Sequence, residues 1–141
     1  MKRISRLIIL LALLGILAAP AVAGATHLNL TSLVGTWHNT DPNTKGIVKL
    51  IITDGAGAQI RAFSACEPDL CDWGTVSGTA YGRNESAMNA NALIAVYDTA
   101  YGESVMTGSR AGTNLRVEVF TKLKDGGEQS ARSSTGVFVR E

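Results

Sequence analysis

Along most of this chain, short runs rich in hydrophobic and β-branched residues are separated by short polar stretches. After residue 23 the hydrophobic residues do not recur with the period of an α-helix over any useful length. Gly, Asn, Asp and Pro residues, which favour turns, separate the β-rich runs. Eight runs at fairly even spacing are expected to be strands: Leu33–Thr40, Gly46–Thr53, Ala58–Ala65, Trp73–Tyr81, Ala92–Asp98, Ser104–Arg110, Leu115–Lys122 and Ala131–Arg140. This pattern predicts an all-β sandwich or barrel.

Every connection between these runs is short, which favours up-and-down hairpins over crossing connections. Eight antiparallel strands joined in this way can close on themselves and so remove the edges of the sheet. We therefore predict an all-β fold, an eight-stranded antiparallel up-and-down β-barrel over residues 33–141, with a lead-in segment at residues 24–32. The interior of such a barrel is just wide enough for side chains or one small ligand.

The first 23 residues have the pattern of a secretory signal peptide. A basic start and an unbroken apolar run precede a cleavage site of small residues. These parts are Lys2, Arg3 and Arg6, then Leu7–Leu17, then Ala21-Val22-Ala23. The pattern predicts a secreted or periplasmic protein with no stable membrane insertion after cleavage. The alternative is an anchor that is not cleaved, because the apolar stretch to Ala23 lies at the lower edge of a membrane span.

Charge narrows the class of partner. The 141-residue chain carries 13 Lys and Arg residues against 12 Asp and Glu residues. Without the three basic residues of the predicted signal, ten basic residues remain against the 12 acids, which gives a net charge of −2. The length suits one domain with one core. No basic face of the kind that binds nucleic acid is expected.

The run FSACEPDLCDWG contains both cysteines of the chain, Cys66 and Cys71. Two cysteines in an exported protein most often pair, and a bridge across so short a loop is geometrically reasonable. A redox centre would favour Cys-x-x-Cys at the start of a helix. A zinc site needs four ligands, and His27 and His38 are the two histidines of the chain. We therefore predict a structural disulfide, with no metal and no cofactor.

The two terminal strands resemble those of the calycin barrels, which include the lipocalins and avidins. The run LVGTWHN is similar to a first strand with Gly-x-Trp, here Gly35 and Trp37. The run GVFVRE contains Arg140 near the end of the last strand. In those families an arginine at this place packs across the tryptophan at the closed end of the barrel. The resemblance implies the same structural pair here, Trp37 with Arg140.

Elementary physical chemistry agrees with this role for Trp37 and Arg140. An indole buries a large area, and a guanidinium over its face adds a cation–π interaction of about 0.5–2 kcal/mol. If Trp37 points inward, a period of two places Asn39 and Asp41 inward as well, nearer the mouth. In the avidins the asparagine at the position of Asn39 binds the ureido group of the ligand. The resemblance therefore implies a ligand-binding role for Asn39, and Asp41 is the second candidate.

The middle of the chain departs from the avidin pattern. The avidins line their site with several tryptophans from later strands, whereas this chain has one other tryptophan, Trp73. Biotin is therefore not the expected ligand. No catalytic set is apparent either, because His38 and Asp41, three positions apart, would point to opposite faces of one strand. We do not expect an enzyme.

Three hypotheses about function follow. The first is a small exported barrel that holds an unidentified small molecule through Asn39, Asp41 and other residues of the mouth. The second is a protein-binding barrel, of inhibitor or adhesion type, that uses the disulfide-bridged turn with Glu67, Asp69 and Asp72. The third is a structural barrel with a filled interior and no ligand.

Overall fold

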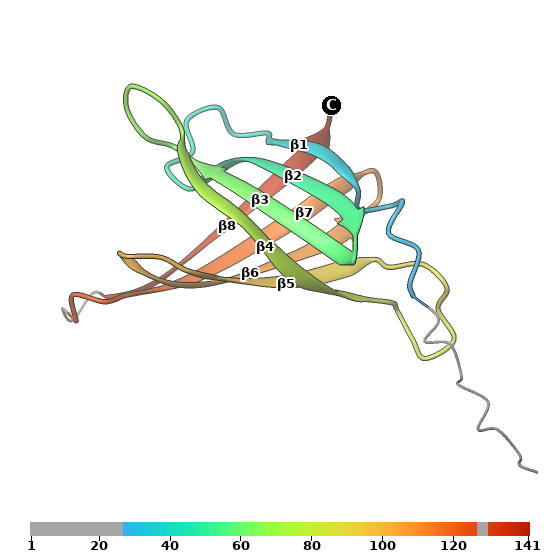
Figure 1. Cartoon of the computed structure of the whole chain (residues 1–141). Coiled ribbons are helices and arrows are strands. Elements are labelled where there is room, and N and C mark those ends of the chain that lie inside the picture. The colour runs from blue at the N-terminus through green and yellow to red at the C-terminus, as the bar shows by residue number, and fades with distance from the viewer. Residues whose placement is uncertain (1–26, 127–129) are drawn as a thin grey trace, which may run out of the picture.

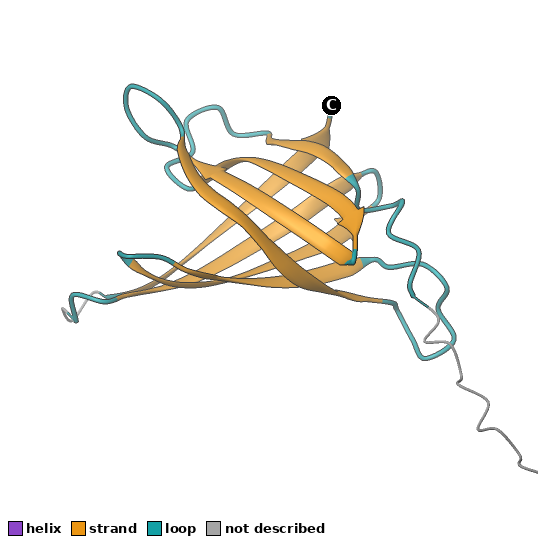
Figure 2. Ribbon diagram, in the orientation of Figure 1, coloured by secondary structure: helices purple, strands orange, loops and turns teal. Residues whose placement is uncertain are grey.

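The structure is a computed structural model that describes residues 27–126 and 130–141. Eight antiparallel strands follow one another around a closed barrel (Figure 1 and Figure 2). They are β1 (Gly35–Asn39), β2 (Ile47–Gly55), β3 (Gly57–Ser64), β4 (Cys71–Tyr81), β5 (Ala92–Asp98), β6 (Gly102–Ala111), β7 (Asn114–Leu123) and β8 (Ala131–Arg140). The described residues contain no α-helix, and so none that is long and apolar enough to cross a membrane.

The predicted fold class is confirmed, including the up-and-down order of the strands. β5 and β8 have the predicted bounds. β1 is shorter than predicted because Leu33 and Val34 belong to a turn in which both backbone N–H groups donate to the carbonyl oxygen of Leu30. The predicted signal peptide, residues 1–23, lies outside the described residues.

The barrel closes through β1, which pairs with β2 on one side and with β8 on the other. In the closing ladder Trp37 stands opposite Arg140, and Asn39 stands opposite Phe138. Because strand directions alternate, the connections that follow β1, β3, β5 and β7 gather at one end of the barrel (Figure 1). We call this end the open end and the other the closed end.

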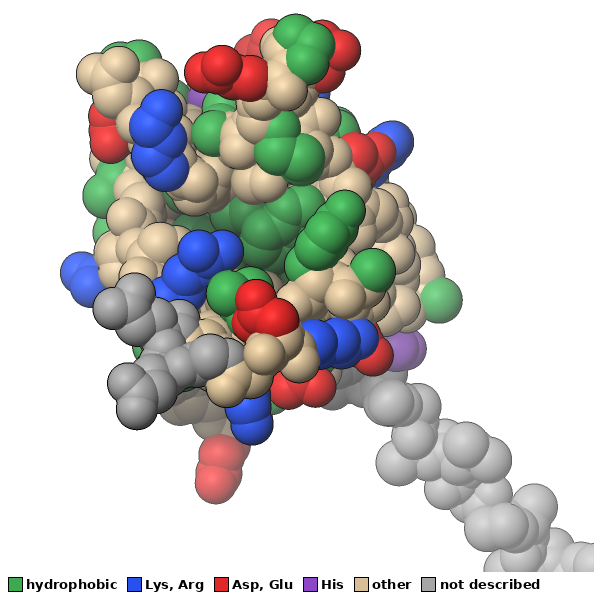
Figure 3. All heavy atoms as spheres, turned by 90° about the vertical axis from the view of Figure 1, so that its left-hand side faces the viewer, with side chains coloured by type: hydrophobic (Ala, Val, Ile, Leu, Met, Phe, Trp, Pro, Cys, Tyr) green, Lys and Arg blue, Asp and Glu red, His purple; other side chains and the backbone are tan. Residues whose placement is uncertain are grey.

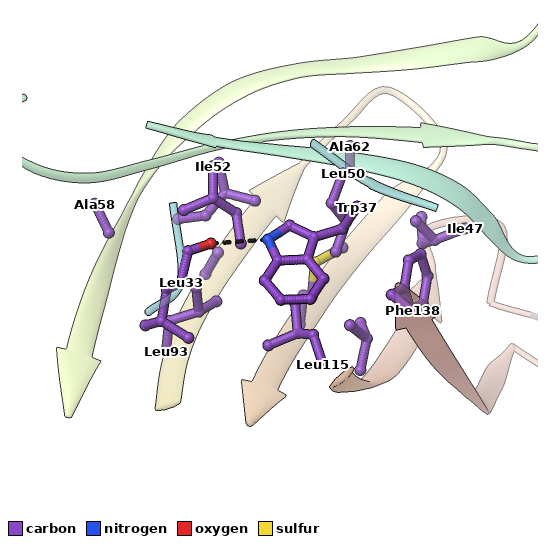
Figure 4. Close-up of a cluster of buried hydrophobic side chains, with 14 of the residues drawn as sticks. Leu33, Trp37, Ile47, Leu50, Ile52, Ala58, Ala62, Leu93, Leu115 and Phe138 are labelled. Carbon is purple, nitrogen blue, oxygen red and sulfur yellow. Dashed lines mark hydrogen bonds between the residues drawn. The ribbon is translucent and has the colours of Figure 1, made fainter. Parts of the chain in front are cut away.

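Hydrophobic side chains fill the barrel toward the closed end. The largest is Trp37, which is fully buried and donates its Nε1–H to the carbonyl oxygen of Leu33 at 2.8 Å (Figure 4). Leu50, Ile52, Leu93, Leu115 and Phe138 pack in the same cluster. Full burial of one such side chain stabilises the fold by about 1.5–3 kcal/mol.

Residues 27–34 cover the closed end. Leu30 and Leu33 are buried in the core. Asn29 pairs through its backbone with Asn89, in the connection between β4 and β5, as an isolated parallel β-bridge. The hydroxyl of Ser32 donates to the carbonyl oxygen of Ala90 in the same connection. The segment therefore seals this end of the barrel and leaves the opposite end accessible.

Candidate functional site at the open end

Two adjoining cavities lie at the open end, with volumes of about 610 Å³ and 470 Å³. Four residues line both of them: Ser64, Trp73, Thr121 and Arg132. Figure 3 looks into this end and shows a hollow with a hydrophobic floor and charged side chains around its rim. We call the two cavities together the mouth.

Trp73 reaches the mouth because β4 is bulged beside it. The pairing of β3 with β4 shifts by one residue between Arg61 and Phe63, and Gly74 has a positive φ of 78°. A bulge of one residue reverses the face to which the neighbouring side chains point. Trp73 and Val76 therefore both pack toward the core, although an unbroken strand would place them on opposite faces.

The indole of Trp73 is held by two neighbours. Its Nε1–H donates to the hydroxyl of Ser64 at 2.9 Å. Its ring meets the ring of Tyr97 edge to face, with the centroids 5.4 Å apart and an interplanar angle of 78°. These contacts fix the plane of the indole at the bottom of the mouth, where an aromatic surface suits an apolar or planar ligand group.

Tyr97 supports this floor from below. Its side chain is 1% exposed, and its hydroxyl donates to the carbonyl oxygen of Ile60 at 2.9 Å. Burial, and to a smaller extent the charge of Asp72, raises the pKa of the Tyr97 phenol well above its ordinary value of 10.0. The phenol therefore stays neutral and keeps its hydrogen bond at any physiological pH.

Hydroxyl groups form much of the wall of the mouth. The hydroxyls of Ser104 and Thr121 lie 2.8 Å apart, across β6 and β7. Ser134 lines the larger cavity together with Thr44, whose hydroxyl accepts the backbone N–H of Gly46 at 3.2 Å. Each hydroxyl can both donate and accept, so the wall can bind polar groups of either kind.

Four charged residues line the mouth: Lys45, Asp41, Asp72 and Arg132. Asp72 forms a bidentate ion pair with Arg61. Hydrogen bonds from Arg61 and from the backbone N–H of Gly74 hold the pKa of Asp72 below its ordinary value. Within residues 27–126 and 130–141, neither Lys45 nor Arg132 has an ion-pair partner.

The two predicted ligand-binding residues occupy different places. Asp41 lines the larger cavity, beyond the end of β1. Asn39 instead borders a separate space of about 20 Å³, which has room for about one water molecule. The amide of Asn39 donates to the carbonyl oxygen of Ile47, and its oxygen accepts the N–H of Asp41, both at 2.9 Å. Its side chain therefore joins the start of β2 to the turn after β1, and a ligand role for Asn39 stays a prediction.

The disulfide between Cys66 and Cys71 is present, as predicted, with 5.5 Å between the two Cα atoms. It bridges the base of the turn that projects from the open end between β3 and β4 (Figure 1). Cys66 lines the larger cavity and Cys71 the smaller one. The bridge is therefore part of the rim of the mouth. A disulfide of this kind is typical of proteins in an oxidising compartment.

The three acids predicted to contact a protein are not equivalent. Glu67 and Asp69 are exposed on the bridged turn beside Leu70, which is 43% exposed. Asp72 lies on β4, where it is bound to Arg61. The turn itself therefore offers two acids and one leucine to solvent.

At the closed end the guanidinium of Arg140 lies over the indole of Trp37, with Cζ 4.6 Å from the ring centroid. Gly35 leaves room for the arginine, because a Cβ atom there would lie 3.2 Å from Arg140 Cδ. The sequence did not indicate that a second guanidinium, that of Arg110, would lie 5.2 Å from the same centroid. Burial, and then the charge of Arg140, lowers the pKa of Arg110.

Most residues of the mouth were not predicted. Ser64, Thr121 and Arg132 are single polar residues on β3, β7 and β8, and the closure of the barrel brings β3 close to the paired strands β7 and β8. A signal for Arg132 existed, because counting back by twos along β8 from Arg140 and Phe138 places Arg132 on the inner face. Trp73 gave no such signal, because the bulge at Gly74 reverses the alternation.

Comparisons with known proteins give no match: no family model, curated protein or solved structure matches the chain. The described residues contain no group of three or more His, Cys, Asp or Glu side chains that is placed to hold a metal ion. The candidate site is therefore defined by its own geometry: a floor of aromatic rings, a wall of hydroxyl groups and a charged rim.

Proposed function

We propose that this chain is a small exported β-barrel protein that binds a small molecule in the mouth. The observation that carries the proposal is the pair of adjoining cavities, of about 610 Å³ and 470 Å³, around Trp73. Ligand sites of proteins commonly have volumes of roughly 300–1,000 Å³ and combine apolar surface with a few polar groups. Each of the two cavities has a volume within this range, and the mouth has this mixture of apolar surface and polar groups.

The proposal includes a relation to the calycin barrels and an extracellular or periplasmic location. The relation is supported by Gly35, Trp37 and Arg140, which resemble the calycin pattern and meet at the closed end. The location is supported by the signal-like sequence of residues 1–23 and by the disulfide. Neither inference specifies the ligand.

The two tryptophans of the chain allow a direct test. In a ¹H–¹⁵N correlation spectrum, the indole N–H of Trp73 reports on the mouth and that of Trp37 reports on the closed end. A library of small metabolites should contain compounds that shift the Trp73 signal in a saturable manner and leave the Trp37 signal in place. If no compound does so, the barrel has no small-molecule function.

A variant with a filled mouth sharpens this test. Ser134→Phe places a ring in the larger cavity, which Ser134 lines, and should abolish the response of Trp73 to every binder. Ser109→Phe is the matched control, because Ser109 is an exposed residue of β6 that lines neither cavity. Equal binding by both variants would place the ligand elsewhere.

A second candidate function is the binding of a protein through the disulfide-bridged turn. The observation in its favour is the exposed Leu70 between acids on a turn that projects from the barrel. Reduction of Cys66–Cys71 should then abolish binding of the partner, because the shape of the turn depends on the bridge. Binding of a small molecule in the mouth should largely survive the same treatment. A structural barrel without a ligand should show neither behaviour.

A further inference from the structure

We propose that the mouth selects a compact organic anion: an aromatic ring held against Trp73, joined to a carboxylate held by Arg132. This inference rests on the proposed function and names the class of its ligand. It follows from the balance of charge around the mouth, from the position of Arg132 and from the hydrogen bond that the indole N–H of Trp73 already makes.

The first argument is the balance of charge around the mouth. The negative charge of Asp72 is offset by its ion pair with Arg61. Lys45 and Arg132 then stand against Asp41 among the described lining residues, which leaves one positive charge in excess. One oxygen of Asp41 accepts the N–H of Asn43 in its own loop. The chain beyond residue 23 carries a net charge of −2, so the mouth is positive against the average of the molecule.

The second argument is the position of Arg132. It lies opposite Thr121 in the ladder of β7 and β8, and successive steps of two along β8 from Arg132 pass Ser134 and Gly136 and reach the buried Phe138. Its side chain therefore belongs to the inner face, and it lines both cavities. A guanidinium presents parallel N–H groups that match the two oxygens of a carboxylate. Within the described residues no carboxylate of the protein occupies this fork.

The third argument is the state of Trp73. Its Nε1–H already donates to Ser64, so the indole offers a ligand its ring surface and no further hydrogen-bond donor. Tyr97 holds the indole edge to face, and an aromatic ring of a ligand gains most from a surface fixed in this way. Hydroxyls at Ser134 and Thr44 can donate to a carboxylate oxygen at the edge of the larger cavity.

Phenylacetate and phenylacetamide form a suitable pair of probes, because they have the same size and ring and differ in charge. Titration into the full-length protein, followed through the indole N–H of Trp73, should show that phenylacetate binds about tenfold more tightly, as a charge-assisted contact with the exposed Arg132 allows. Added salt should reduce this preference, because salt screens exposed charges. The Trp37 signal reports whether each variant is folded.

Arg132→Gln should make the two probes bind alike, with the affinity for phenylacetamide unchanged. Arg132→Lys should restore part of the preference, because a lysine keeps the charge without the fork. Arg83→Gln is the matched control, since Arg83 is exposed in the connection between β4 and β5, at the closed end. This control should keep the full preference of the parent protein.

The outcomes separate this inference from the proposed function. If both probes bind alike to the parent protein, or if Arg132→Gln keeps the preference, the inference is wrong and the mouth is still a binding site. If neither probe shifts Trp73 while a library compound does, the inference is again wrong by itself. If no compound of any kind shifts Trp73, the proposed function fails as well.

Discussion

Arg140 places its guanidinium over the fully buried indole of Trp37, with Cζ 4.6 Å from the ring centroid, and the two residues stand opposite each other where β8 closes on β1. The guanidinium also donates to the carbonyl oxygen of Ser32 in the segment that covers the closed end. The side chain of Arg140 therefore joins the first strand, the last strand and the lead-in segment.

Removal of this indole should weaken the fold more than any surface change. We expect Trp37→Ala to lower the free energy of unfolding by about 3–5 kcal/mol, as other buried aromatic truncations do. Arg140→Ala should cost about 0.5–2 kcal/mol, because the cation–π contact is lost. Urea unfolding measures both, with Arg83→Ala as the control for loss of an arginine. Variants of Trp37 and Arg140 that unfold at the urea midpoint of the parent would remove the case for a structural pair.

The bulge at Gly74 should control the direction of Trp73. Gly74 has a φ of 78°, and nothing lies within 4 Å of a Cβ atom built there. Gly74→Ala should therefore cost about 1–2 kcal/mol through the backbone alone, and Gly74→Asn should cost less because asparagine tolerates positive φ. In the alanine variant the indole N–H signal of Trp73 should move, since relief of the bulge turns the ring out of the mouth. An unchanged Trp73 signal together with unchanged stability would show that the bulge does not set the floor of the mouth.

The Cys66–Cys71 bridge should stabilise the protein without being essential to the fold. The bridge closes a short loop, for which the chain-entropy estimate is about 2 kcal/mol. Unfolding with and without reductant measures this difference, and the double variant Cys66→Ser, Cys71→Ser controls for effects of the reductant elsewhere. Titration of thiols in the native protein comes first. Two reactive thiols without reductant would show that the bridge does not form.

Tyr97 should make the protein sensitive to alkali. Its pKa is raised in the folded state, whereas in the unfolded chain it returns to about 10. The folded state therefore keeps a proton that the unfolded state loses, so the stabilisation is complete below pH 10 and declines as the pH rises above it. At neutral pH, Tyr97→Phe should lower the free energy of unfolding by about 1 kcal/mol, because the hydrogen bond to Ile60 is lost. Above pH 10 the stability of this variant should fall less than that of the parent protein. A parallel decline in both proteins would assign the alkaline effect to other groups.

The fold was predictable because each strand follows a local rule. Turn residues bound β5 and β8 at the predicted positions, and short connections leave the up-and-down order as the simplest arrangement. The disulfide was predictable for the same reason, since both cysteines lie at one turn. The lengths of β1 and β6 were less well predicted, because hydrogen bonds to other segments decide where a strand begins and ends.

The mouth was much less predictable, because it is made by contacts between strands. Ser64 and Arg132 are distant in sequence and come together when the barrel closes. The direction of Asn39 follows from alternation, but its hydrogen bond to Ile47 depends on how the turn after β1 folds. Trp73 could not be assigned to the interior without the bulge, which a single glycine in a Gly-rich strand does not reveal.

The sealed closed end limits the route by which any ligand could reach the interior of the barrel. Over the described residues, Leu30, Leu33 and Trp37 block the closed end, so a ligand of the kind proposed would enter and leave the mouth by the same opening. An internal segment of a polymer could not pass through a barrel that is open at one end alone, whereas a free end of the polymer could enter the mouth. If the mouth binds a small molecule as proposed, a ligand attached to a larger carrier could therefore bind without release from that carrier, provided that its point of attachment faces the opening.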